Sequence, residues 1–183
     1  MPNAMIRCCI GSALLLLAGC SSLQPMAPGL HELNLLPPSE GPAAALLKQK
    51  ITLQSGQREQ QFLAVARFTR EQLGLVVLLP SGQRLLTLDY DGTELLQQDL
   101  AMFDLPGREI LAIMQAATWP EASVRAHYPA SAGWRLQVST NARQLLTDSG
   151  AALTITYSPG ELRIDNHLKE YRVIVETLER TSL

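Results

Sequence analysis

The stretch from Arg58 to Leu100 constrains the fold more than any other part of the chain, because it has the pattern of a β-meander. Apolar, β-favouring runs of about six to ten residues recur there between polar or glycine-containing breaks, as in strands joined by short hairpins. The breaks are Thr69–Gln72, Pro80–Gln83 and Asp91–Gly92. Asp91–Gly92 is the strongest hairpin signal, since both residues tolerate the positive φ angles of a tight two-residue turn.

The middle of this meander is apolar on both faces of the predicted strand. Side chains that alternate to one face are Leu73, Leu75, Val77 and Leu79, and those on the other face are Gly74, Val76 and Leu78. One face of an antiparallel sheet usually meets water, so this pattern predicts a cover on both faces. A helix, a protein partner or a hydrophobic ligand supplies such a cover, and an ordinary buried central strand explains the same pattern.

The first nineteen residues have the composition of an export signal. A positive start at Arg7 precedes an apolar run, Cys8 to Ala18, which is too short for a permanent bilayer-spanning helix. The run ends in Leu17-Ala18-Gly19-Cys20, which resembles the bacterial lipobox, whose cysteine is acylated and becomes the first mature residue. Residues 1–19 are therefore the predicted signal peptide and Cys20 the predicted lipid attachment site. An ordinary signal peptide with an incidental cysteine is the alternative.

Lipid attachment at Cys20 predicts where in the cell the protein is located. Each buried acyl CH₂ contributes about 0.8 kcal/mol, and stable anchoring takes more than one chain, which a triacylated cysteine supplies. By resemblance to Gram-negative lipoproteins, a serine in the next position, Ser21, implies sorting to the outer membrane, with the protein on its periplasmic side.

The proline-rich segment 20–42 is a predicted tether, and residues 43–183 are a predicted single domain. The tether holds five of the eleven prolines, a composition typical of extended linkers. It also carries an apolar patch that either docks on the domain or stays free, formed by Leu30, Leu33, Leu35 and Leu36.

A change of period after the meander predicts a helix over Leu105 to Trp119. Its apolar residues Ile110, Leu111, Met114 and Ala117 follow helical spacing. Asp104 is the expected cap, Pro106 is expected in the first turn, and Pro120 ends the helix. Ile113 and Met114 are expected either in the core or against a lipid.

The remainder of the chain alternates between apolar and polar residues, as strands with one buried face do. The strands expected there are Val124–His127, Trp134–Ser139, a brief edge at Leu145–Leu146, Leu153–Tyr157, Leu162–Ile164 and a last strand over Tyr171–Val175. With the meander, this predicts a mainly antiparallel α+β domain of about ten strands and one main helix. A curved sheet of that size around one helix would leave a concave face.

The composition of the chain argues against nucleic acid binding and against a disulfide-stabilised domain. Acidic residues outnumber basic ones by 17 to 15 and no basic patch is present, so nucleic acid is not an expected partner. Cys8 and Cys9 leave with the signal and Cys20 carries lipid, so the mature domain has no cysteine for a disulfide.

No catalytic or cofactor motif occurs in the sequence. The three histidines (His31, His127 and His167) are isolated, and the Asp91–Gly92 turn explains the carboxylates Asp89, Asp91 and Glu94 without calcium. We therefore expect no enzyme activity, no cofactor and no bound metal.

The succession FLAVARF, LGLVVLLPSGQRLLTLDYDG, ILAIMQAATWP, GWRLQV and YRVIVETLE resembles a group of short Gram-negative lipoproteins that carry only a domain-of-unknown-function label. Genes of that group often accompany clusters for aryl polyene pigments. The group is in turn distantly similar to the LolA/LolB lipoprotein carriers. The resemblance implies a half-open antiparallel barrel with helical segments in its concave face. It also implies a protruding apolar loop residue that contacts the membrane, for which Leu105 and Leu79 are candidates.

Two functions follow from these observations. In the first, the half-barrel binds an acyl chain, a lipoprotein lipid or a polyene lipid and helps to seat it at the outer membrane. The expected ligand contacts are Leu75, Val77, Leu79, Ile110 and Met114, with Leu105 as the membrane-contact candidate. In the second, the chain is a scaffolding lipoprotein with a filled interior that binds a periplasmic or outer-membrane protein. An apolar cavity favours the first function, and a filled core with an exposed apolar surface favours the second.

Overall fold

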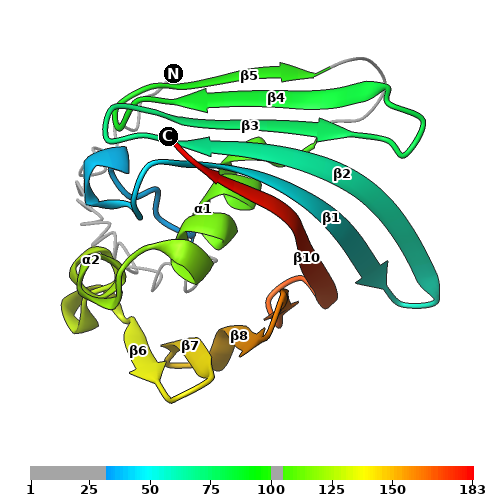
Figure 1. Ribbon diagram of the computed structural model, residues 1–183. Coiled ribbons are helices and arrows are strands. Elements are labelled where there is room, and N and C mark those ends of the chain that lie inside the picture. Colours follow the sequence, from blue (N-terminus) through cyan, green and yellow to red (C-terminus); the bar gives the residue numbers. More distant parts are fainter. Residues whose placement is uncertain (1–31, 100–104) are drawn as a thin grey trace, which may run out of the picture. The chain divides into compact units, whose positions relative to one another are not determined.

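The computed structural model describes residues 32–99 and 105–183, and its main feature is one sheet of ten strands (Figure 1). After β1 (Ala45–Ser55), four strands form the expected meander: β2 (Arg58–Phe68), β3 (Leu73–Leu78), β4 (Arg84–Tyr90) and β5 (Leu95–Asp99). The other five follow the helices: β6 (Arg135–Val138), β7 (Ala142–Thr147), β8 (Gly150–Ser158), β9 (Glu161–Asn166) and β10 (Tyr171–Ser182).

The two groups of strands are joined where β1 pairs with β10. The strand order is β5-β4-β3-β2-β1-β10-β9-β8-β7-β6, and every neighbouring pair is antiparallel. The edge strands β5 and β6 are consecutive along the chain, and the helical segment connects them. The predicted α+β class, with about ten antiparallel strands, is confirmed.

The sheet curves around a central helix (Figure 1). Register shifts interrupt three of the strand pairs, between Lys48 and Gln49 in β1, between Val77 and Leu78 in β3, and between Leu145 and Leu146 in β7. Such irregularities bend a strand and increase its twist. The shifts therefore account for part of the curvature that produces the concave face.

The central helix α1 (Gly107–Thr118) lies on this concave face and confirms the predicted helix. Its buried residues Leu111, Ala112, Ala116 and Ala117 belong to the core. Pro106 occupies the N-cap position instead of the first turn, and Asp104 lies outside the described residues. As expected, Pro120 ends the helix, because the preceding Trp119 is extended.

Gly107 allows the start of α1 to approach the sheet closely. A Cβ atom at this position would lie 2.6 Å from Leu88 Cδ2 on β4 and would overlap the side-chain oxygen of Gln97 on β5. Any larger residue at this position would therefore require the side chains of Gln97 and Leu88, or the helix itself, to shift.

A second helix, α2 (Glu121–His127), replaces the strand that we expected over Val124–His127. That expectation is wrong because Pro120 both ends α1 and starts α2, at a position where proline's missing N–H costs nothing. Leu145 and Leu146 were also misjudged, since they belong to β7, which has a strand on each side. Two short 3-10 turns, η1 (Pro38–Glu40) and η2 (Ala130–Ala132), complete the helical elements of the described residues.

The hairpin at Asp91–Gly92 is present, but its loop has four residues instead of two. Tyr90 pairs with Leu95, and the Asp91 N–H donates to the Glu94 carbonyl. Asp91 Oδ1 accepts the N–H groups of Thr93 and Glu94 at 2.8 Å each, and these bonds lower the pKa of the Asp91 carboxyl. Gly92 supplies the positive φ of 101°.

One compact unit runs from His31 to Leu183, so it begins before the expected domain boundary at residue 43. Residues 33–41, which we call the strap, cover α1 and α2. Leu33 and Leu36 are buried in the core, and Trp119 Nε1 donates to the Pro37 carbonyl at 3.0 Å. Of the two alternatives for the apolar patch, docking is the one observed for these residues.

Gln115 holds the strap to α1 with a pair of buried hydrogen bonds. The Leu36 N–H donates to Gln115 Oε1 at 2.8 Å, and Gln115 Nε2 donates to the Leu36 carbonyl at 2.7 Å. Both residues have no exposed surface. The glutamine thus gives the strap the partners that a neighbouring strand would otherwise give it.

We predict that Gln115→Ala destabilises the domain by about 2–4 kcal/mol, because the buried N–H and carbonyl of Leu36 lose their partners. The measurement is the free energy of unfolding from urea denaturation. The matched control is Gln137→Ala, which alters an exposed glutamine on β6 and should leave this free energy within about 0.5 kcal/mol of the wild-type value. Equal stabilities for the two variants would contradict the role assigned to Gln115.

Candidate hydrophobic ligand site

A partly enclosed pocket of about 380 Å³ lies between α1 and the concave face of the sheet. Its floor comes from β1, β2, β3, β9 and β10, so it sits at the junction of the two groups of strands. This volume falls within the range of small-molecule sites, about 300–1,000 Å³.

The floor of the pocket consists of rows of paired residues that cross the strands. In one row Phe62 pairs with Ile51, Ile51 with Val175, and Val175 with Leu162. The adjacent row is Gln60, Leu53, Val173 and Ile164. Paired residues point to the same face of a sheet, and all eight line the pocket.

The roof of the pocket is one side of α1. The helical residues that line it are Glu109, Ile110, Ile113, Met114 and Thr118, preceded by Leu105 and Pro106. Ile110 and Met114 are only partly buried, although both face the interior. The helix therefore presents apolar surface to a space that the protein's own side chains leave unfilled.

Most of the residues singled out from the sequence lie together here. Leu75, Val77, Ile110 and Met114 all line the pocket. Leu79 packs against the core without lining the pocket. Leu105, the membrane-contact candidate, also lines it, and Cys20 and Ser21 lie outside the described residues.

One end of the pocket is polar and is organised around Glu109. Glu109 Oε1 accepts hydrogen bonds from the Tyr171 hydroxyl at 2.8 Å and from Asn166 Nδ2 at 3.2 Å, and Oε2 accepts one from Lys169 Nζ. The Glu109 side chain is 16% exposed. The sequence analysis missed these residues, whose only signal was an acidic residue in the first turn of a mainly apolar helix.

We call Glu109 and its partners Asn166, Lys169 and Tyr171 the Glu109 group. The tyrosine of this group resists ionisation. Burial raises the pKa of Tyr171, and its hydrogen bond to the Glu109 carboxylate acts in the same direction. The hydroxyl therefore remains a donor, which keeps the N-terminal turn of α1 attached to the turn between β9 and β10.

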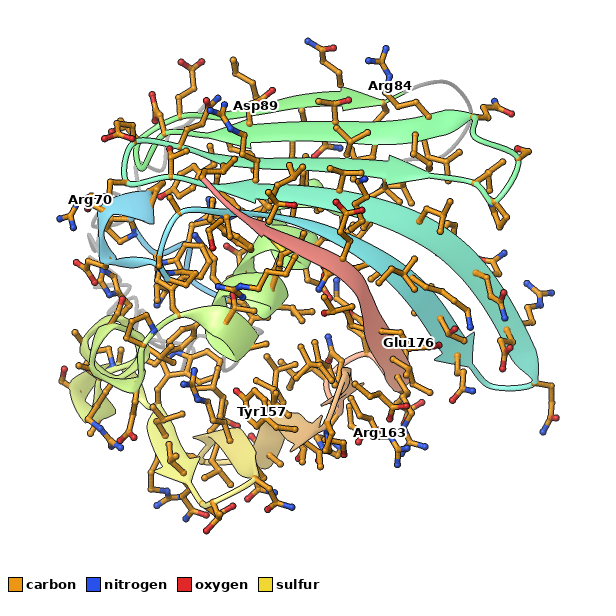
Figure 2. All side chains as sticks on the ribbon, in the orientation of Figure 1. Arg70, Arg84, Asp89, Tyr157, Arg163 and Glu176 are labelled. Atoms are coloured by element: carbon orange, nitrogen blue, oxygen red, sulfur yellow. The ribbon has the colours of Figure 1, made fainter. Side chains whose placement is uncertain are left out.

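The other end of α1 is held by side chains from β7 and β8. Arg143 Nη1 donates to the Trp119 carbonyl at 2.7 Å, and the Tyr157 hydroxyl donates to the Ala117 carbonyl at 2.8 Å. Figure 2 shows Tyr157 rising from β8 towards the helix. These donors satisfy carbonyls that a helix end leaves without partners.

Three further observations concern metal ligands, a histidine that lies near a hydroxyl group, and the length of the helices. No group of three or more His, Cys, Asp or Glu side chains is placed to hold a metal ion in the part of the chain that is described. The Thr154 hydroxyl and His167 Nε2 are 2.9 Å apart, but neither residue lines the pocket. Within residues 32–99 and 105–183, neither helix has the length and apolar composition of a bilayer-spanning segment.

Comparisons with known proteins give one family match and one structural likeness. The model of the family DUF3261, described as a protein of unknown function, matches residues 46–179. A crystal structure attributed to an outer membrane lipoprotein-sorting protein domain, from Vibrio parahaemolyticus, is 7% identical in sequence. It aligns over 76% of this chain and 85% of that chain, with a TM-score of 0.42. A search of the curated proteins found no match.

We predict that the stability of the domain falls in alkaline solution because of its four tyrosines. Burial raises the pKa of Tyr90, Tyr128, Tyr157 and Tyr171. The folded protein therefore keeps protons that the unfolded chain releases at about pH 10. This contribution is complete below that pH and is lost as the pH rises towards the folded-state values.

Urea denaturation on both sides of about pH 10 measures this loss of stability. Near-ultraviolet absorbance reports tyrosinate in the same samples, and it should rise at higher pH in the native protein than in urea. A native protein whose tyrosines titrate as they do in urea, without loss of stability, would contradict the prediction.

Proposed function

We propose that this chain, which belongs to the DUF3261 family of proteins of unknown function, is a non-catalytic binding protein for a hydrophobic ligand. The pocket holds an acyl chain or a chain of similar shape, such as that of a lipid, a lipoprotein or a polyene lipid. The observation that carries the proposal is the apolar space between α1 and the concave face of the sheet.

The pocket favours a hydrophobic ligand because inward-pointing apolar side chains are left only partly covered. Ile51, Phe62 and Val173 face the interior, yet each keeps part of its surface exposed. A bound chain would remove that surface from water, and each buried CH₂ contributes about 0.8 kcal/mol. Polar groups lie mainly at one end, as the binding of a ligand with one polar end requires.

The scaffolding alternative is less well supported. It requires a filled interior and a continuous exposed apolar surface. The large exposed apolar residues of the described part are dispersed over β5, β6, the turn before β10, β10 itself and the residue after it: Leu96, Val138, Leu168, Leu178 and Leu183. Single exposed residues of this kind are ordinary on protein surfaces.

The place of action in the proposal is the periplasmic side of the outer membrane. Its support is the sequence around Cys20 and Ser21, where lipid attachment and sorting are expected. Because the compact unit starts at His31, only the ten residues 21–30 separate it from Cys20. Ten residues span at most about 36 Å, so the pocket would stay close to the membrane surface.

We predict that residues 21–183 bind the neutral fluorescent probe N-phenyl-1-naphthylamine, and that Met114→Trp weakens this binding at least about tenfold. The larger side chain occupies the space between α1 and β2 that the ligand needs. Fluorescence titration measures the affinity, and circular dichroism establishes that the variant is folded.

The matched control is Leu178→Trp, which places the same indole on a residue that is 60% exposed on β10, outside the pocket. This variant should bind the probe as the wild type does. A folded wild-type domain that does not bind the probe, or equal binding by the two variants, would contradict the proposal.

We predict that Cys20→Ala abolishes lipid attachment and releases the protein from membranes. The substitution removes the sulfur to which the acyl chains attach, and with them the free energy of about 0.8 kcal/mol for each buried CH₂. Membrane fractionation and the intact mass of the mature protein provide the readouts. A variant that remains in the membrane fraction would contradict the anchor. Cys9→Ala, in the same signal segment, is the control and should leave attachment unchanged.

A further inference from the structure

We propose that the ligand is an anionic amphiphile, whose negatively charged head group binds between Arg58 and Lys169 at the polar end of the pocket. This inference rests on the proposed binding of a hydrophobic chain and adds the charge of its head group. The shared chemistry is a carboxylate or phosphate attached to an aliphatic chain.

The sheet register places Arg58 at the polar end of the pocket. Arg58 pairs with Ser55, Ser55 pairs with Tyr171, and Tyr171 pairs with Asn166. Ser55 and Tyr171 both line the pocket. Because paired residues share a face of the sheet, Arg58 lies on the concave side, two strands from Tyr171 and just outside the lining of the pocket.

Arg58 and Lys169 are the two cations at this end of the sheet, and they differ in their partners. Lys169 is paired with Glu109, whereas the side chain of Arg58 makes no hydrogen bond or ion pair with any described residue. Lys169 Nζ has three N–H donors, of which Glu109 takes one, and its side chain is 57% exposed. Both cations therefore have donors available for an anion.

The neighbouring carboxylates do not neutralise Arg58. Glu59 bonds to Gln54 on the opposite face, and Asp165 is paired with Arg172, also on that face. Glu170 lies in the turn beside Lys169, but it makes no ion pair or hydrogen bond with either cation. The N-terminus of α1 at the same end adds the positive end of the helix dipole.

The length of the pocket suits a medium-length chain. Its lining along α1 runs from Glu109 to Thr118, a rise of about 13 Å along the helix. A dodecanoyl chain has a similar extended length. Its carboxylate would lie near Lys169 and Arg58 while the hydrocarbon lies over Ile110 and Met114.

The test compares dodecanoate with its neutral ester, monododecanoylglycerol, as competitors of N-phenyl-1-naphthylamine on residues 21–183, below their micelle concentrations. We expect dodecanoate to bind more tightly, and Arg58→Gln to weaken its binding about fivefold to tenfold through loss of a charge-assisted hydrogen bond. The affinity of the ester should change less than about twofold, because no charge is lost from its interaction. Added salt should weaken the binding of dodecanoate alone.

Arg84→Gln is the matched control. Arg84 is an exposed arginine without a partner at the hairpin between β3 and β4, and it lies away from the pocket (Figure 2). The variant has the same net charge as Arg58→Gln and should bind both competitors as the wild type does. Arg58→Glu, which reverses the charge, should weaken dodecanoate binding further.

The outcomes separate the two proposals. If neither competitor displaces the probe, the proposed binding of a hydrophobic chain is wrong. If both displace it equally and Arg58→Gln changes neither affinity, the chain-binding site stands and the anionic class is overturned. Dodecyl phosphate, tested in the same way, distinguishes a phosphate head group from a carboxylate.

Discussion

The antiparallel pairing of β1 with β10 is the interaction on which the rest of the structure depends. It joins strands more than a hundred residues apart and makes one sheet from two groups of strands, each built from short hairpins. Since the edges of this sheet are β5 and β6, the helical segment between them must pass from one edge to the other. The passage across the concave face places α1 inside the curve (Figure 1).

The pocket exists because α1 is attached to the sheet at both ends, whereas its middle leaves a space between the helix and the sheet. At the N-terminal end, Gly107 allows close contact with β4 and β5, and Glu109 bonds to the turn between β9 and β10. At the C-terminal end, Arg143 and Tyr157 hold the helix carbonyls. Small and polar residues make these attachments. The larger apolar residues between them face a space that no side chain of the domain fills.

The sequence predicted most of the strands, the main helix and several residues of the pocket because each follows from a local period. Leu75 and Val77 alternate along a strand, and Ile110 and Met114 are one helical turn apart. The features it did not predict depend on distant partners. Glu109 acquires its role from Asn166 and Tyr171, and Arg58 from the register that brings β10 beside β1. Residues 176–182, polar in sequence, form a strand because β1 pairs with them.

The docked strap also has a mechanical consequence. It belongs to the amino-terminal part of the chain, and its two bonds to Gln115 lie in the carboxyl-terminal half of α1. Tension applied to that end of the chain therefore acts directly on the helix that forms the roof of the pocket. The parallel pair of bonds at Leu36 must break before the strap leaves the core. The domain thus has a defined point at which a pulling force would first be resisted, and that point lies on the same helix whose other residues, Ile110 and Met114 among them, line the pocket.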